Sequence, residues 1–199
     1  MTVRLAEPID ATASPSWCRR LVADLDAADA RAIAVAEGIT VAQLNWRPSP
    51  GVWSVGQCLE HLSIANEVYV EPMVESLGVA PSGPVDEILL GRLADWFIRT
   101  YIEPTAQTKR ARAPRKIVPR AQEVAASILA RFIASNVGVR DIIARARGHD
   151  INRVQFRNPF VPLLRFSVGT GLQVITRHNH RHLLQAERVR QSPEFPRRR

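Results

Sequence analysis

Four long segments of the chain place apolar residues at the spacing of an amphipathic helix, and proline or glycine residues separate these segments. The segments cover about residues 15–37, 54–77, 121–147 and 167–190. Because each amphipathic helix must bury its apolar stripe against a neighbour, the pattern predicts an all-α fold. Ser54 is the predicted N-cap of the second helix, and Gly38 and Gly148 are the predicted ends of the first and third.

The connection between the second and third segments, residues 79–120, is long enough to cross one end of a helical bundle. It contains a shorter amphipathic segment, about 86–101, which we predict to be helical. Pro72 is expected either to kink the second helix or to end it early. Residues 149–166 mix polar with apolar side chains, so we expect them to form a loop that walls a pocket.

Length and composition predict a single soluble domain over residues 1–199. A chain of 199 residues with 46% hydrophobic content can bury a substantial core. No stretch is apolar enough to span a membrane, and the first residues lack the apolar centre of a secretory signal. Cys18 and Cys58 lie far apart in the sequence and match no metal-binding or redox spacing, which fits a reducing compartment. We therefore expect a cytoplasmic location and no membrane partner.

The chain is strongly basic, with a net charge of +8 that comes almost entirely from arginine. The densest cluster covers residues 109–120 and is joined by the tail 197–199. Such clusters attract phosphates, but specific nucleic-acid recognition usually adds aromatic stacking groups, and residues 109–120 contain none. We expect a solvated loop that attracts anions or maintains solubility, and no specific nucleic-acid partner.

Two histidines of the last helical segment lie on its buried side. A helix turns about 100° per residue, so His178 and His182 share one face, whereas His180 points elsewhere. Apolar residues fall on or beside the same stripe: Val168, Leu172, Ile175, Ala186 and Val189. Two inward imidazoles either converge on a metal ion or are held by ordinary hydrogen bonds.

A third histidine makes the metal interpretation stronger. His61 shares a stripe of the second helix with Cys58 and Ala65, so it also faces inward. Catalytic zinc commonly has three protein ligands and an open fourth position, which three histidines on two helices can provide. A peptidase of the H-E-x-x-H type needs a glutamate where this chain has Asn179.

Other polar residues near these histidines have less specific roles. We expect Arg181 to be a surface charge, and His149 to cap a helix or face solvent rather than act as a fourth ligand. Side chains that could orient an imidazole or a substrate are Gln57, Glu60, Asn66, Glu67 and Gln185.

The motif Trp46-x-Pro48, the pair Trp53-Ser54 with His61 seven residues further on, and the late His178-x-x-x-His182-x-x-Gln185 resemble the DinB/YfiT-like superfamily. Its members are small four-helix bundles, and the likeness spans most of the chain. The resemblance implies a bundle with a long connection from the second to the third helix. It also implies that His61, His178 and His182 hold one divalent metal. The family includes bacillithiol S-transferases and mycothiol-dependent maleylpyruvate isomerases.

These observations support a metal-dependent enzyme, for which the resemblance implies a low-molecular-weight thiol as cosubstrate and transfer of that thiol to a small molecule. The alternatives are a metal-assisted hydrolase and a non-catalytic bundle with a structural metal that binds a partner or a second copy as a dimer. Imidazole suits zinc, nickel, iron and copper alike, so the sequence does not select the metal.

Overall fold

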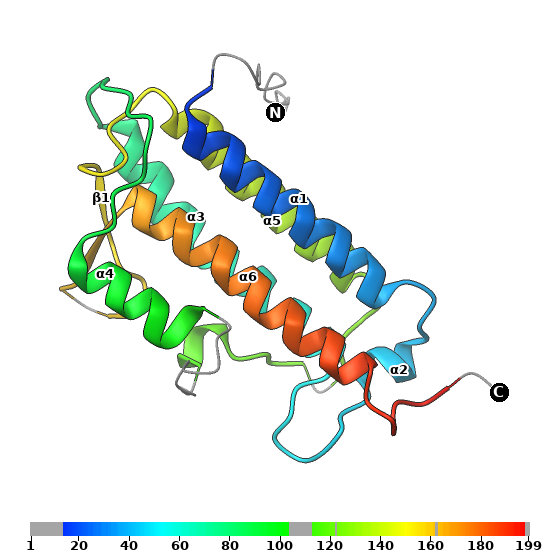
Figure 1. Cartoon of the computed structure of the whole chain (residues 1–199). Helices are drawn as coiled ribbons and strands as arrows, with labels where there is room; N and C mark the ends of the chain where they lie inside the picture. Colours follow the sequence, from blue (N-terminus) through cyan, green and yellow to red (C-terminus); the bar gives the residue numbers. More distant parts are fainter. Residues whose placement is uncertain (1–13, 104–112, 122, 162, 198–199) are drawn as a thin grey trace.

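Four long helices form a bundle in the computed structural model, which describes residues 14–103, 113–121, 123–161 and 163–197 (Figure 1). They are α1 (Ser16–Ala36), α3 (Val55–Gly78), α5 (Ile128–Ala146) and α6 (Val168–Arg190). The helices α3 and α1 each pack mainly against α5 and α6, so α3 and α1 lie diagonally across the bundle. The predicted all-α fold is confirmed.

The apolar core has two parts, one toward each end of the bundle. One part surrounds Trp17 and Met73, and the other surrounds Leu59 and Phe132; all four side chains are fully buried. Between the two parts lies a polar layer to which each long helix contributes. Its members are Asp29 of α1, Asn66 of α3, Ser135 and Asn136 of α5, and Asn179 of α6.

Asn136 is the centre of this layer. Its Oδ1 accepts from Asn66 Nδ2 at 2.9 Å and from Asn179 Nδ2 at 3.0 Å, and its own Nδ2 donates to Asp29 Oδ1 at 2.7 Å. Arg140 also donates to Asp29, at 2.7 Å. Because buried amides are costly unless they are paired, these bonds hold the four helices at one relative height.

The helix α3 begins as predicted. Ser54 is its N-cap: the hydroxyl accepts from the backbone N–H of Gln57 at 3.1 Å, while the Gln57 side chain accepts from the Ser54 N–H at 3.2 Å. Pro72 lies inside α3 and does not end it. A short helix that the sequence did not predict, α2 (Val41–Asn45), precedes it and is capped in the same way by Thr40.

The helix α5 begins at Ile128, later than the predicted start near residue 121. The side chain of Asn45 accepts from the backbone N–H of Val124 at 2.7 Å and donates to the Val124 carbonyl at 2.9 Å. Val124 is buried against Gly56 of α3. A Cβ added to Gly56 would lie 3.1 Å from the Cβ of Val124. The apolar side chain of Val124 therefore anchors a non-helical segment on α3. It is not part of a turn of helix.

The connection after α3 is helical over a shorter stretch than predicted. The α-helix α4 covers Arg92–Phe97 and continues as a π-helical turn, η1 (Ile98–Ile102). Residues before α4 are held as non-helical chain beside the start of α1, where Trp17 Nε1 donates to the Val85 carbonyl at 2.9 Å and the Ser16 N–H donates to Asp86 at 2.8 Å. These contacts explain why the helix does not begin near residue 86.

Two further segments of the described chain complete the fold. A 3-10 turn, η2 (Arg115–Ile117), precedes α5. The stretch expected to be a loop contains a small antiparallel hairpin, β1 (Gln155–Arg157) and β2 (Arg165–Ser167), in which Phe156 pairs with Phe166. Among the residues that the structure describes, no helix has both the length and the apolar character that a membrane crossing requires.

Both cysteines are packing residues. Cys18 and Cys58 are buried, each in a different part of the core. Burial raises the pKa of the Cys18 thiol to about 11 and that of the Cys58 thiol to about 12. Because the thiolate is the reactive form, neither side chain is a nucleophile at neutral pH.

Replacing Gly171 by alanine should destabilise the bundle. A Cβ at Gly171 would lie 2.7 Å from the ring of Phe156 and would also collide with Met73. Overpacking of this kind costs about 1–3 kcal/mol of unfolding free energy. The control is Gly138→Ala in α5, where the added Cβ lies 3.8 Å from Val70 and higher helix propensity should add about 0.5–1 kcal/mol. Urea unfolding measures both variants, and equal stabilisation by the two substitutions would contradict the packing argument.

Candidate metal centre

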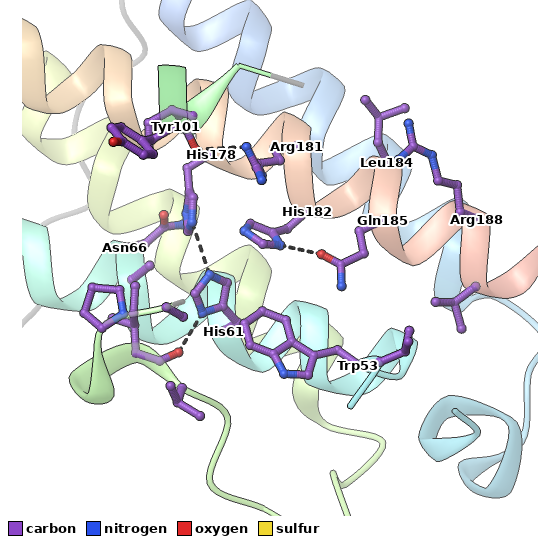
Figure 2. Close-up of a pocket in the computed structure, with 18 of the residues that line it drawn as sticks. Trp53, His61, Asn66, Tyr101, His178, Arg181, His182, Leu184, Gln185 and Arg188 are labelled. Carbon is purple, nitrogen blue, oxygen red and sulfur yellow. Dashed lines mark hydrogen bonds between the residues drawn. The ribbon is translucent and has the colours of Figure 1, made fainter. Parts of the chain in front are cut away.

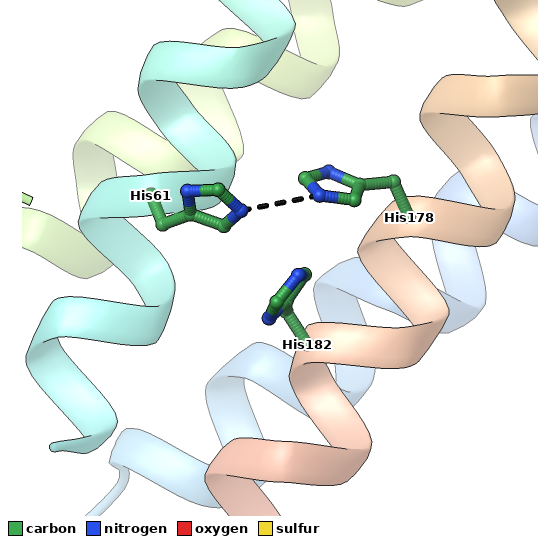
Figure 3. A group of neighbouring side chains, drawn as sticks. All are labelled: His61, His178 and His182. Carbon is green, nitrogen blue, oxygen red and sulfur yellow. Dashed lines mark hydrogen bonds between the residues drawn. The ribbon is translucent and has the colours of Figure 1, made fainter. Parts of the chain in front are cut away.

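Three histidines lie together between α3 and α6, at the wall of a pocket (Figure 2). His61 comes from α3, and His178 and His182 come from successive turns of α6 (Figure 3). The potential ligand atoms of the three residues all lie within 4.8 Å of one another, and the Nε2 atoms of His61 and His178 are 3.1 Å apart. The structure thus brings together the three histidines that the sequence selected, and the group could hold one metal ion.

Hydrogen bonds to the outer nitrogens orient two of the rings. His61 Nδ1 lies 2.6 Å from the carbonyl oxygen of Ile117, and His182 Nδ1 lies 2.9 Å from Oε1 of Gln185. Because both oxygens can only accept, each Nδ1 carries the hydrogen and each Nε2 keeps its lone pair. Metal-binding histidines typically have this arrangement, with the outer N–H held by a carbonyl or amide oxygen.

Burial keeps the imidazoles neutral. Desolvation lowers the pKa of His61 to about 4, although the Ile117 carbonyl acts in the opposite direction. Desolvation and the neighbouring His61 lower the pKa of His182 to about 3. The pKa of His178 is also well below its usual value, first because of burial and then because of the two other rings. Neutral imidazole is the form that binds a metal, so the group is ready for an ion at neutral pH.

Trp53 covers the group on the side of α3. Its ring centroid lies 4.7 Å from that of His61 and 5.7 Å from that of His182. The indole therefore packs against two rings at once and limits the access of water to them. The sequence placed Trp53 in the family motif but assigned it no role.

The turn η2 packs against α3 beside the group. Ile117 is 5% exposed, and its carbonyl oxygen is the partner of His61 Nδ1. This residue lies in the basic stretch 109–120, and the expectation of a solvated loop is wrong at this position because the side chain is buried and the backbone binds His61. The part of that stretch at 109–112 and the tail residues 198–199 lie outside the described residues.

The pocket beside the histidines has a volume of about 1680 Å³. Residues of α3, of the connection, of the hairpin loop and of α6 line it. Its aromatic members are Trp53, Tyr69, Phe97, Tyr101 and Phe160. Residues 149–166 thus contribute to the wall through Phe160, as expected from the sequence.

Arg181 lines this pocket, contrary to the expectation of a surface charge. It is half-buried, and its Nη1 donates to the backbone carbonyl of Tyr101 at 2.9 Å. Burial lowers the pKa of its guanidinium. The reason for its position is helical spacing, since Arg181 follows His178 by three residues and therefore lies near the same face.

The other polar candidates have mostly structural roles. Gln57 caps α3, Glu67 pairs with Arg131 at 2.8 Å, and Glu60 is buried but does not line the pocket. His149 Nδ1 lies 2.9 Å from the Pro81 carbonyl, away from the group, and takes no part in it.

Two of the nearby residues belong to the site itself. Gln185 holds His182, and Asn66 connects the pocket wall to the polar layer. His180 points to the other side of α6, where its Nδ1 contacts Arg31.

The fold and the histidine group define a helical-bundle protein with a candidate three-histidine metal centre. A family model described as the DinB superfamily matches residues 24–186, which is most of the chain. The chain belongs to this superfamily, as its motifs predicted. A search of curated proteins and a search of solved structures each found no match.

Acid should destabilise the metal-free protein between about pH 6.5 and pH 4. The pKa values of His61, about 4, and of His182, about 3, lie below the ordinary value of 6.5. In this window the unfolded chain binds protons that the folded chain does not. The part of the unfolding free energy that depends on these rings is therefore complete above pH 6.5. It falls as the pH drops, by up to about 1.4 kcal/mol per pH unit for each ring.

Urea unfolding at a series of pH values, in the presence of a chelator, measures the slope of the unfolding free energy against pH. The double variant His61→Gln, His182→Gln should lose about two thirds of it, because only His178 of the three buried rings remains to titrate. His149→Gln is the matched control and should keep the slope, since all three rings of the group remain. A double variant with the parent's slope would show that these rings do not cause it.

Proposed function

We propose that this protein is a divalent-metal-dependent enzyme whose ligands are His61, His178 and His182. The observation that carries the proposal is the geometry of the group: three ligand nitrogens within 4.8 Å of one another, with the Nδ1 atoms of His61 and His182 bound to oxygen. Membership of the DinB superfamily supports the same assignment. Zinc, nickel and iron all suit three imidazoles.

The surroundings favour a catalytic ion over a structural one. Structural zinc sites are usually closed by four protein ligands, whereas catalytic sites keep one position open. Within the described part of the chain, no cysteine or carboxylate joins the three histidines, and the group borders a large pocket. A small molecule can therefore reach the position that the protein leaves free.

We propose transfer of a low-molecular-weight thiol to a small electrophile as the reaction. When bound, a divalent ion with three neutral ligands lowers the pKa of a thiol or of water at its free position. The described lining of the pocket contains no aspartate or glutamate that could take a proton from water. This composition favours a thiol, which ionises near neutral pH, over water, and places metal-assisted hydrolysis second. The pocket volume of about 1680 Å³ also leaves room for both a thiol and its acceptor.

The protein's own side chains position the reactants. Gln185 and the Ile117 carbonyl hold the rings of His182 and His61, and Trp53 limits water on one side. A cytoplasmic location is part of the proposal, since it fits two buried free cysteines and a thiol cosubstrate.

The alternative is a non-catalytic bundle that pairs with a second copy. Exposed apolar side chains around α4 favour it: Leu89 is 70%, Leu93 63% and Trp96 53% exposed. A dimer through this surface is compatible with either function.

Alanine substitution of each histidine tests the ligand set. His61→Ala, His178→Ala and His182→Ala should each lower bound metal from about one ion per chain to a small fraction, because two imidazoles hold a divalent ion far less tightly than three. His180→Ala is the matched control on the same helix and should bind as the parent does. Elemental analysis after gel filtration measures the content. Unchanged content in His182→Ala, with helical circular dichroism retained, would refute the ligand assignment.

Cobalt substitution separates a catalytic site from a closed one. Adding 2-mercaptoethanol or L-cysteine should change the visible absorption of the cobalt protein in a saturable way, because the open position accepts a thiolate. The His178→Ala protein mixed with the same amount of cobalt is the control, and it should show neither the spectrum of bound cobalt nor the change on adding thiol. A spectrum that stays constant with every thiol, while cobalt remains bound, would favour the binding or scaffold alternative.

A further inference from the structure

The pocket beside the histidines is lined by cationic and aromatic side chains but by no acidic ones. Arg181 and Arg188 are its charged members, and no aspartate or glutamate occurs among the described residues of its wall. An ion held by three neutral imidazoles would add positive charge to the same space. A ligand that carries a negative charge is therefore favoured there over a neutral one.

Several arginines of the long helices pair with a carboxylate, and Arg181 is not one of them. Arg31 pairs with Glu187 at 2.7 Å, Arg131 with Glu67 at 2.8 Å and Arg140 with Asp29 at 2.7 Å, and Arg177 pairs with Glu103. In the part of the chain that the structure describes, no carboxylate is paired with Arg181.

The guanidinium is nevertheless fixed in place. Its Nη1 donates to the Tyr101 carbonyl at 2.9 Å, and the side chain is half-buried at the pocket wall, one residue before His182 (Figure 2). The guanidinium has five N–H donors in a planar fork that matches a carboxylate. A cation that is partly desolvated and already oriented binds a carboxylate more strongly than a mobile surface arginine does.

Aromatic rings line the same pocket as Arg181. The rings of Phe97 and Tyr101 lie 5.7 Å apart, and those of Tyr69 and Phe160 lie 5.5 Å apart, all four at the pocket wall. Such a surface favours a flat apolar body. Together with the cation, it selects a molecule that has a carboxylate at one end and an aromatic ring at the other.

We propose that Arg181 is a specificity-determining residue that binds the carboxylate of a small aromatic acid, and that this acid is the small-molecule substrate of the site. The inference rests on the proposed function, because it assigns the substrate of the same centre. Arg181 and the histidines line one pocket, and Arg181 directly precedes His182 in α6, so a molecule held by its carboxylate at Arg181 lies in the space that the histidine group also borders.

Calorimetric titration of the zinc-loaded protein tests the proposal with two isosteric probes, 3-phenylpropionate and 3-phenylpropionamide. The carboxylate should bind at least about tenfold more tightly than the amide, because hydrogen bonds to a charged group are stronger than those to a neutral one. Arg181→Gln should abolish this preference, and Arg181→Lys should restore part of it. Arg145→Gln, which removes an exposed arginine of α5 outside the pocket lining, is the charge-matched control and should keep the preference.

A preference for the carboxylate that survives Arg181→Gln would overturn the proposal, since the ion or another residue would then be the carboxylate site. The carboxylate could instead belong to the thiol. If 3-mercaptopropionate shows a preference over 2-mercaptoethanol that depends on Arg181, while 3-phenylpropionate shows none over its amide, the substrate assignment is wrong. Zinc content is measured on every sample. A parent protein that holds no zinc would refute the proposed function, whereas full zinc content without selectivity would refute only this inference.

Discussion

The placement of three neutral imidazoles inside a helical bundle is the constraint on which the rest of the site depends. Removing a histidine from water favours its neutral form, but the ring then needs a partner for its remaining N–H. Two of the three rings have such a partner. His61 Nδ1 donates to the Ile117 carbonyl, and His182 Nδ1 donates to Oε1 of Gln185. The long connection between α3 and α5 is therefore part of the site, because it brings the backbone oxygen of Ile117 to Nδ1 of His61.

The polar layer lies next to the histidine group along the bundle. The helix α6 couples the two, because it contributes residues to both. Asn179 lies between the two histidines of this helix in sequence and bonds Asn136 on α5, so it fixes the rotation that points His178 and His182 toward α3. A layer of buried amides costs stability relative to an apolar core, but it permits one helix register where apolar packing alone would tolerate several. In this bundle the register decides whether the histidines meet.

Much of the architecture could be predicted because it depends on periodicity. Apolar spacing identified the four long helices, and helical geometry placed His61, His178 and His182 on inward faces. The errors arose where tertiary contacts decide. Val124 fits a helical pattern but docks as non-helical chain held by Asn45, and the hairpin around Phe156 and Phe166 is too short to give a period. The role of Ile117 could not be found at all, because its backbone carries no sequence signal. Arg181 was predicted to be a surface charge but lines the pocket, because a pocket borders a wider arc of a helix than a packed core does.

The contact between His61 and Ile117 has a consequence for how this protein can vary. The acceptor is a main-chain oxygen, so a side-chain replacement that keeps the backbone path does not remove it. Residues of the connection can therefore diverge widely while the orientation of His61 is retained. Insertions or deletions near η2 are different, since they shift which carbonyl lies beside the ring. Tolerance to substitution combined with sensitivity to length is thus built into this segment.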